Sequence, residues 1–75
     1  MTTPEQLRAA RALLGISQAD IADMTGRTTK TIRRAETDAD AVAAATIAAI
    51  RAALEDAGVE FIAENGGGPG VRLRK

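Results

Sequence analysis

The residues with the clearest chemical potential are the cations between Arg27 and Arg34. Four basic side chains, Arg27, Lys30, Arg33 and Arg34, lie in this short segment with no acidic residue among them. Lysine and arginine neutralise phosphate, and both can read guanine in the major groove of DNA. Lys30 and Arg34 are like charges four residues apart, a spacing that mildly destabilises a helix unless an anion binds. A solvated helix face is the ordinary alternative, and the missing acids argue against it.

The residues that are absent narrow the chemistry further. The chain of 75 residues contains no cysteine and no histidine, which excludes disulfides, thiolate zinc sites and the commonest general base. We therefore expect no enzyme activity, no metal and no cofactor. No secretory signal opens the chain, and its longest nearly continuous apolar run, residues 41–50, is far shorter than a bilayer span. We expect a cytoplasmic protein without membrane contact.

Size and charge distribution suggest a partner chain and a polyanion. Half of the apolar residues are alanine and Phe61 is the only aromatic, so the core is expected to be thin and a homodimer is favoured. The net charge is zero, but Arg72, Arg74 and Lys75 form a second basic group at the end of the chain. This group is either a strand edge kept soluble, which we favour, or a second phosphate contact.

Capping residues and apolar periodicity predict the first two helices. Threonine, proline and glutamine in a capping pattern begin a helix over 3–15, which ends in glycine. Ser17 and Asp20 form a second capping pair and begin a helix over 17–26, again closed by glycine. The apolar residues expected to face the core are Leu7, Ala10, Leu14, Ile21, Ala22 and Met24.

A third helix explains the threonines beside the basic segment. Thr28 is the expected N-cap, because threonine is unfavourable inside a helix and favourable at its boundary. On residues 29–36, a rotation of 100° per residue places Ile32 and Ala35 on one side. The three later cations then occupy the opposite, solvent-facing side.

A fourth helix and a hairpin complete the expected architecture. Ile47, Ile50 and Leu54 predict a helix that ends at Gly58, although no distinct cap marks its start. Its alanines could admit a partner helix or could simply be good helix formers. We expect the helical DNA-binding domain to cover residues 1–58 and a hairpin extension of the same domain to cover 59–75.

The hairpin is predicted from alternating residues on either side of the segment ENGGGPG. Each register that keeps the apolar residues on one face sets Glu60 opposite Arg72 or Arg74. An isolated two-stranded hairpin is marginal in water, so this one must lie on the helices or pair with another chain. The glycines also match a phosphate-loop spacing, but no helix follows them, so a flexible turn is favoured.

The second and third helices together form the central motif. Ala22 is a small residue where two helices can approach, Gly26 suits the turn, and Ile32 supplies the apolar contact. The stretch LLGISQADIADMTGRTTKTIRRAE resembles the Cro and phage-repressor helix-turn-helix family, also called the XRE family, and the resemblance covers roughly residues 5–57. It implies a mainly α fold, a repressor-like domain of four to five helices, here with a C-terminal β-hairpin.

The resemblance also implies roles for individual side chains. Gln18 would contact a phosphate at the start of the second helix, and Glu36 would pair with Arg11 of the first helix in a structural role. On the third helix, one group would face base edges and another would lie nearer the DNA backbone. The base-facing residues would be Thr29, Lys30 and Arg34, and the backbone residues Thr28 and Arg33.

Two residues depart from the family pattern. Arg27 stands where an apolar residue is usual, and it could either reach DNA or bend back to a carboxylate. Ala35 is smaller than the residue normally found there, which thins the contact between the helices.

The sequence thus predicts a sequence-specific regulator of transcription that binds double-stranded DNA. A repressor acting as a homodimer is the simplest form, because the chain has no room for an effector domain. The alternative is a protein-interaction module, such as an antitoxin-like partner protein, that uses the hairpin edge or the fourth helix.

Overall fold

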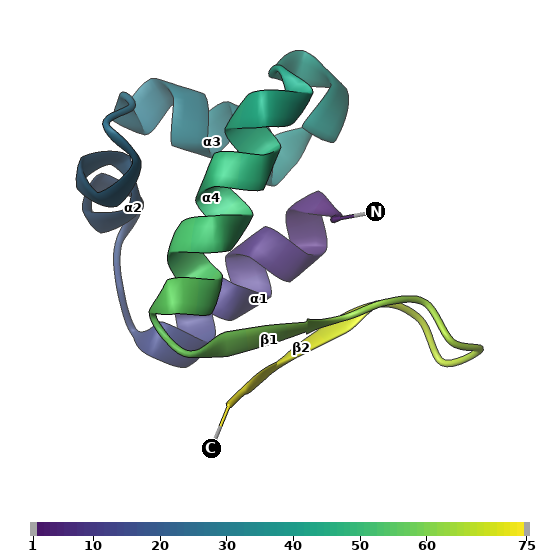
Figure 1. The fold of residues 1–75 in the computed structure, drawn as a ribbon. Coiled ribbons are helices and arrows are strands. Elements are labelled where there is room, and N and C mark those ends of the chain that lie inside the picture. Colours follow the sequence, from purple (N-terminus) through teal and green to yellow (C-terminus); the bar gives the residue numbers. More distant parts are fainter. Residues whose placement is uncertain (1, 75) are drawn as a thin grey trace.

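The computed structural model describes residues 2–74, which form a bundle of helices with a hairpin along one side (Figure 1). The elements in chain order are α1 (Pro4–Leu14), α2 (Gln18–Thr25), α3 (Thr29–Thr37), the 3-10 turn η1 (Ala39–Ala41), α4 (Ala44–Asp56), β1 (Val59–Ile62) and β2 (Gly70–Leu73). The chain is therefore mainly helical with a C-terminal antiparallel hairpin, as the sequence predicts.

The predicted caps of the first two helices are present. The Thr3 hydroxyl accepts the Gln6 backbone N–H at 3.1 Å, and the Gln6 side chain accepts the Thr3 N–H at 2.9 Å. Ser17 and Asp20 form the same reciprocal pair, at 3.0 and 2.9 Å. Both helices end at a glycine in the left-handed region, where a side chain is strained. Local sequence therefore determines where α1 and α2 begin and end.

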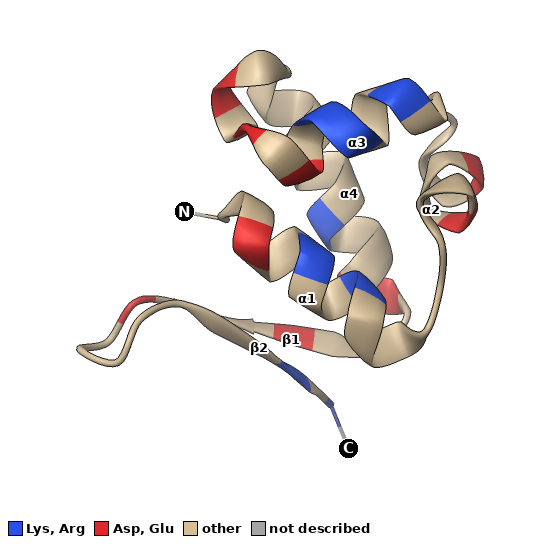
Figure 2. Ribbon diagram, turned by 180° about the vertical axis from the view of Figure 1, so that it is seen from behind, with Lys and Arg blue, Asp and Glu red and all other residues tan. Residues whose placement is uncertain are grey.

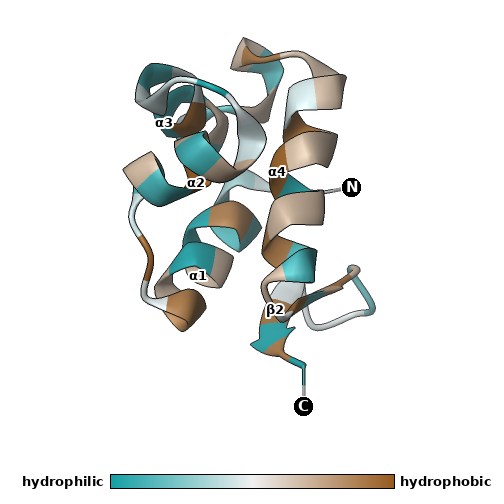
Figure 3. Cartoon of the chain, turned by 60° about the vertical axis from the view of Figure 1, so that its left-hand side comes forward, coloured by the Kyte–Doolittle hydropathy of each residue, from teal (hydrophilic) through white to brown (hydrophobic). Residues whose placement is uncertain are grey.

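The core is small and is shared by every helix and by β1. Each helix carries both apolar and polar segments along its length, as expected for helices with one buried face (Figure 3). The fully buried apolar residues are Leu7, Ala10, Ile21, Ala22, Ile32, Ala35, Ile50, Leu54 and Val59. Three of the nine are alanines, so the core has the thin packing that the composition suggested.

Met24 was predicted to face the core, and this prediction is wrong. Its side chain is 47% exposed, whereas Ile21 and Ala22 are buried. At 100° per residue, Met24 lies about 110° from the middle of the face that Ile21 and Ala22 define. The buried face of the short helix α2 is narrow, so a residue outside it, such as Met24, is exposed to solvent.

The link between α3 and α4 is more ordered than a simple loop. The Asp38 carboxylate accepts the backbone N–H of Asp40 at 3.0 Å and starts the turn η1. Ala43 precedes α4 without a side-chain cap, which agrees with the absence of a capping signal in the sequence. The helix ends at Asp56, and Gly58, with a φ of 112°, turns the chain into β1.

The hairpin lies on the helices, mainly against α1 (Figure 1). Glu60 is opposite Arg72, one of the two predicted partners, and their side chains form an ion pair at 2.9 Å. The Gln6 amide, on α1, donates to the carbonyls of Ile62 and Gly70 at 3.1 and 3.0 Å. One buried glutamine thus caps α1 and holds both strands of the hairpin.

The glycine-rich segment is a hairpin turn rather than a phosphate loop. The Glu64 carboxylate accepts the backbone N–H groups of Gly66 and Gly68, both at 3.0 Å. These are the donors that a phosphate would need, and an internal anion already occupies them. The turn interpretation is therefore the better one.

Two general features bear on the classes of protein considered above. Within residues 2–74, no helix is long and apolar enough to cross a membrane. The same residues contain no group of three or more acidic, histidine or cysteine side chains arranged to hold a metal ion.

Candidate nucleic-acid interface

The helices α2 and α3 form a compact pair around the predicted turn. Gly26 adopts a φ of 67°, and the Arg27 backbone N–H donates to the Ala22 carbonyl at 3.0 Å. Ala22 is 5% exposed and Ile32 is fully buried, so the two helices meet at the small and apolar positions that the motif requires. The structure confirms this part of the sequence analysis.

Thr28 caps α3 as predicted. Its hydroxyl oxygen accepts the backbone N–H of Thr31 at 3.3 Å, and the two threonine hydroxyls lie 3.1 Å apart. Thr29, the first residue of α3, is half-buried beside this cap. The threonines of this segment therefore define where α3 begins.

Three cations form an exposed ridge on α3, which we call the α3 ridge: Lys30, Arg33 and Arg34. All three are exposed, and within residues 2–74 none forms an ion pair with a carboxylate. Figure 2 shows blue segments along α3, and red segments on α2, on α1, in the hairpin and from the C-terminal end of α3 onward. The acidic residue within α3, Glu36, is buried and does not belong to the exposed face. The ridge is consequently a surface of positive potential on a chain with no net charge.

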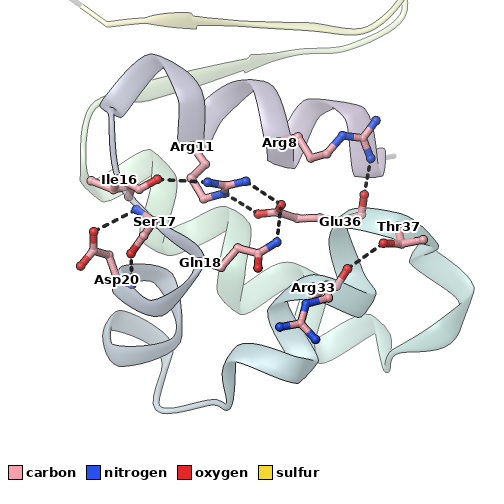
Figure 4. A network of polar contacts seen from close by, with 9 residues as sticks. All are labelled: Arg8, Arg11, Ile16, Ser17, Gln18, Asp20, Arg33, Glu36 and Thr37. Atoms are coloured by element: carbon pink, nitrogen blue, oxygen red, sulfur yellow. Dashed lines mark hydrogen bonds and ion pairs between the residues drawn. The ribbon is translucent and has the colours of Figure 1, made fainter.

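The buried side of α3 is held by an ion pair with α1 (Figure 4). Arg11 donates through Nε and Nη2 to the two carboxylate oxygens of Glu36, at 2.9 and 3.1 Å. The hydrogen bond from Arg11 to Glu36 raises the pKa of Arg11, although partial burial acts in the opposite direction. Glu36 is only 4% exposed, so the pair lies inside the interface between α1 and α3. The expected structural pair is confirmed.

Gln18 is part of the same network. Its side-chain nitrogen donates to Glu36 at 3.1 Å, and the side chain is half-buried at the start of α2. One N–H of the amide is therefore engaged within the protein, while the second N–H and the carbonyl oxygen have capacity left. Contact between Gln18 and a phosphate stays a prediction, now with a defined orientation of the amide.

Arg27 does something that neither sequence interpretation anticipated. Its guanidinium donates to the backbone carbonyl of Thr25 at 2.9 Å, instead of bending to a carboxylate. The carbonyls at the end of a helix lack partners within the helix and attract positive charge. Arg27 thus closes the C-terminal end of α2, which explains how a charged residue is accommodated where the family has an apolar one.

The C-terminal cations lie away from α3. Arg72 is paired with Glu60, and the Arg74 guanidinium donates to the Glu55 carbonyl at 2.7 Å. The hairpin is on the side of α1 opposite α3 (Figures 1 and 2). These contacts favour a strand edge kept soluble over a second phosphate contact; Lys75, the third member of the group, is outside the described residues.

Sequence reasoning missed two residues that position the site. Gln6 was interpreted only as a cap, and its bridge to the hairpin depends on tertiary packing. Arg8 donates from α1 to the backbone carbonyl of Glu36, near the end of α3 (Figure 4). Its spacing of three residues from Arg11 was a usable signal, because it places both arginines on the same face of α1.

Comparison with known families assigns this arrangement. Residues 7–55 match the Helix-turn-helix family of the Cro and phage-repressor type, the XRE family. The chain belongs to this family. It is thereby placed among DNA-binding helix-turn-helix regulators. By position, α3 is the second helix of the motif, which is called the recognition helix in such proteins. Comparison with curated proteins gives no match, and the hairpin lies outside the matched residues.

Proposed function

We propose that this protein is a sequence-specific regulator of transcription that inserts α3 into the major groove of double-stranded DNA. The observation that carries the proposal is the α3 ridge, whose cations are exposed and lack acidic partners within residues 2–74. The opposite face of α3 is fixed by buried Ile32, Ala35 and Glu36, so the ridge is presented on a rigid element. Repression by occlusion of a promoter is the simplest mechanism.

The proposed contacts divide between bases and backbone. Lys30 and Arg34 lie one turn apart on the exposed stripe of α3, and either side chain can bind the O6 and N7 atoms of guanine. Thr29, beside this stripe, is the third proposed base contact. The proposed backbone contacts are Gln18, Thr28 and Arg33.

We further propose that the protein acts as a homodimer. A two-fold dimer would place two recognition helices roughly 34 Å apart, the spacing of half-sites on one face of DNA. Two surfaces support this idea. The first is the exposed alanine face of α4, beside which a cavity of about 320 Å³ opens next to Val42 and Ile47. The second is the hairpin, whose two strands leave two outer edges that a partner strand could pair with. The hairpin also carries Leu73, an apolar side chain that is 44% exposed.

The dimer proposal is tested by sedimentation equilibrium of the purified chain. Ala48→Glu places a charge on the exposed face of α4, and Leu73→Glu places one on the hairpin. The variant that shifts the population toward monomer identifies the interface. A wild type that is monomeric both free and on DNA would refute the dimer.

The DNA-binding proposal is tested with genomic fragments selected by the purified protein, followed by titration of the selected site. Lys30→Ala combined with Arg34→Ala should abolish preference for that site, because it removes two base contacts worth about 1–3 kcal/mol each. Arg72→Ala is the control: it removes one positive charge from the hairpin, far from α3, and should retain the preference for the selected site. Absence of salt-dependent binding of the wild type to any duplex at low ionic strength would show that the proposal is wrong.

A protein-interaction module, such as an antitoxin-like partner protein, is the second candidate. It is favoured by the outer edges of the hairpin, because an unpaired strand edge can accept a strand of another protein. In this case the double variant of Lys30 and Arg34 would still capture its partner, and Leu73→Glu would not. Retention of both capture and DNA binding on separate faces would assign both functions to the chain.

A further inference from the structure

Arg8 lies at the C-terminal end of the recognition helix although it belongs to α1. Its Nη1 donates to the backbone carbonyl of Glu36, one residue before the end of α3 (Figure 4). The side chain is nevertheless 46% exposed. The guanidinium is therefore anchored at one corner and open to solvent elsewhere.

The charge of Arg8 is poorly neutralised within the protein. Its closest carboxylate is that of Glu5, at 3.9 Å, which is too long for a hydrogen bond, and the Glu5 side chain is 75% exposed. By contrast, Arg11, Arg51 and Arg72 each meet a carboxylate at 2.9 to 3.1 Å. A guanidinium has five N–H donors, and the bond to Glu36 uses one of them. Arg8 thus retains both charge and donors for an external anion.

The position of Arg8 is close to two of the proposed backbone contacts. Arg33 precedes Glu36 by three residues, so these two residues lie about 60° apart around the α3 axis. The Gln18 amide donates to the Glu36 carboxylate, and Arg8 donates to the Glu36 backbone carbonyl. Figure 4 shows the three side chains, which come from three different helices, around Glu36 and the C-terminal half of α3.

We propose that Arg8 is a DNA phosphate contact, contributed by α1 at the C-terminal end of the recognition helix. The inference rests on the proposed DNA-binding function and adds a residue that the helix-turn-helix motif itself does not include. A guanidinium held by a helix carbonyl is already oriented, and it can offer paired N–H groups to a phosphate. Asp38 ends α3 and Asp40 lies in the following turn η1, so a cation at this end of the helix also offsets their repulsion of the DNA backbone.

The test is the salt dependence of binding to a mixed-sequence duplex of about 20 base pairs, two helical turns. Fluorescence anisotropy gives the binding constant between roughly 50 and 200 mM salt, and the slope of its logarithm reports the neutralised phosphates. For Arg8→Gln, which keeps an N–H donor but loses the charge, the slope should decrease in magnitude by about 0.9. Arg8→Lys retains the charge and should keep the wild-type slope.

Two further variants separate the possible causes. Arg72→Gln, a change of equal charge on the hairpin, should leave the slope unchanged, while Arg33→Gln should reduce it. If Arg33→Gln responds and Arg8→Gln matches the wild type, the inference about Arg8 is overturned and the proposed function stands. If the wild type itself shows no salt-dependent binding, the proposed function fails first. If Arg8→Lys loses as much slope as Arg8→Gln, the effect comes from packing, and the Arg8 contact is refuted.

Discussion

Arg11→Ala is the sharpest test of how the recognition helix is held. In the wild-type protein the Glu36 side chain is 5% exposed and receives two N–H groups from Arg11 and one from Gln18. Removal of the guanidinium leaves a buried carboxylate whose remaining side-chain donor is the Gln18 amide. A buried charge without its counter-charge is strongly unfavourable, so the native state should lose stability.

The expected magnitude follows from the burial of the two partners. Breaking a buried ion pair by removing one partner costs about 3–5 kcal/mol in the free energy of unfolding. The Arg11 side chain is 26% exposed, so solvent screening places the loss near the lower value, about 3 kcal/mol. A domain of 75 residues has a total stability of roughly 4–11 kcal/mol, so this loss is a large fraction of the whole. The melting temperature should fall by roughly 12–24 °C.

Thermal unfolding followed by circular dichroism measures this effect directly. Arg72→Ala is the matched control, because it removes an arginine from an exposed pair and should change the melting temperature much less. Arg11→Met combined with Glu36→Leu should recover much of the lost stability, since neither charge is then buried alone. If Arg11→Ala melts at the same temperature as Arg72→Ala, the pair does not hold α3 and the reasoning is wrong.

Three other predictions concern the cap and the hairpin. Thr28→Ala should cost about 1 kcal/mol in unfolding free energy, and unchanged melting would contradict its role as the N-cap of α3. Gln6→Leu leaves the Ile62 and Gly70 carbonyls without their side-chain donor, so hydrogen exchange should accelerate in residues 59–73 and not in α2 or α3. The hydrogen bond from Arg72 lowers the pKa of Glu60 below its ordinary value of 4.5. The ion pair therefore stabilises the folded state fully above pH 4.5, and this stabilisation is lost as the pH falls through the lower pKa of Glu60 in the folded protein. NMR of the hairpin should therefore show an acid-induced loosening that Glu60→Gln lacks.

The local elements were predictable because their signals are carried by neighbouring residues. Threonine or serine at a cap, with a glycine at the other end, defines α1 and α2 through contacts within three or four residues. Thr28 defines the start of α3 in the same way, whereas the C-terminal end of this helix is at Asp38 and not at a glycine. Alternation limited the partner of Glu60 to Arg72 or Arg74, since a hairpin with one buried face permits few registers, and the structure selects Arg72.

Several features could not be derived in this way, because they depend on groups that meet only after the helices pack. Met24 belongs to an apolar segment, yet its exposure depends on the narrow angle of the buried face of α2. Arg27 is different, because its partner, the Thr25 carbonyl, is only two residues away, and neither sequence interpretation included a backbone carbonyl. No local pattern distinguishes Gln6 as a bridge to residues more than 50 positions away.

The sequence by itself determined the helix-turn-helix, the basic ridge and the hairpin, since caps, periodicity and charge act over a few residues. Tertiary structure alone decided how these parts are oriented. It brought Arg8 of α1 against the Glu36 backbone carbonyl, beside the Arg11–Glu36 pair that the family resemblance had implied. It also separated the two basic groups by placing the hairpin on the far side of α1. The physical reason is that local residues specify where each helix or strand forms, but not how it is oriented. The orientations are set by packing of α1 to α4 and β1 around one small shared core.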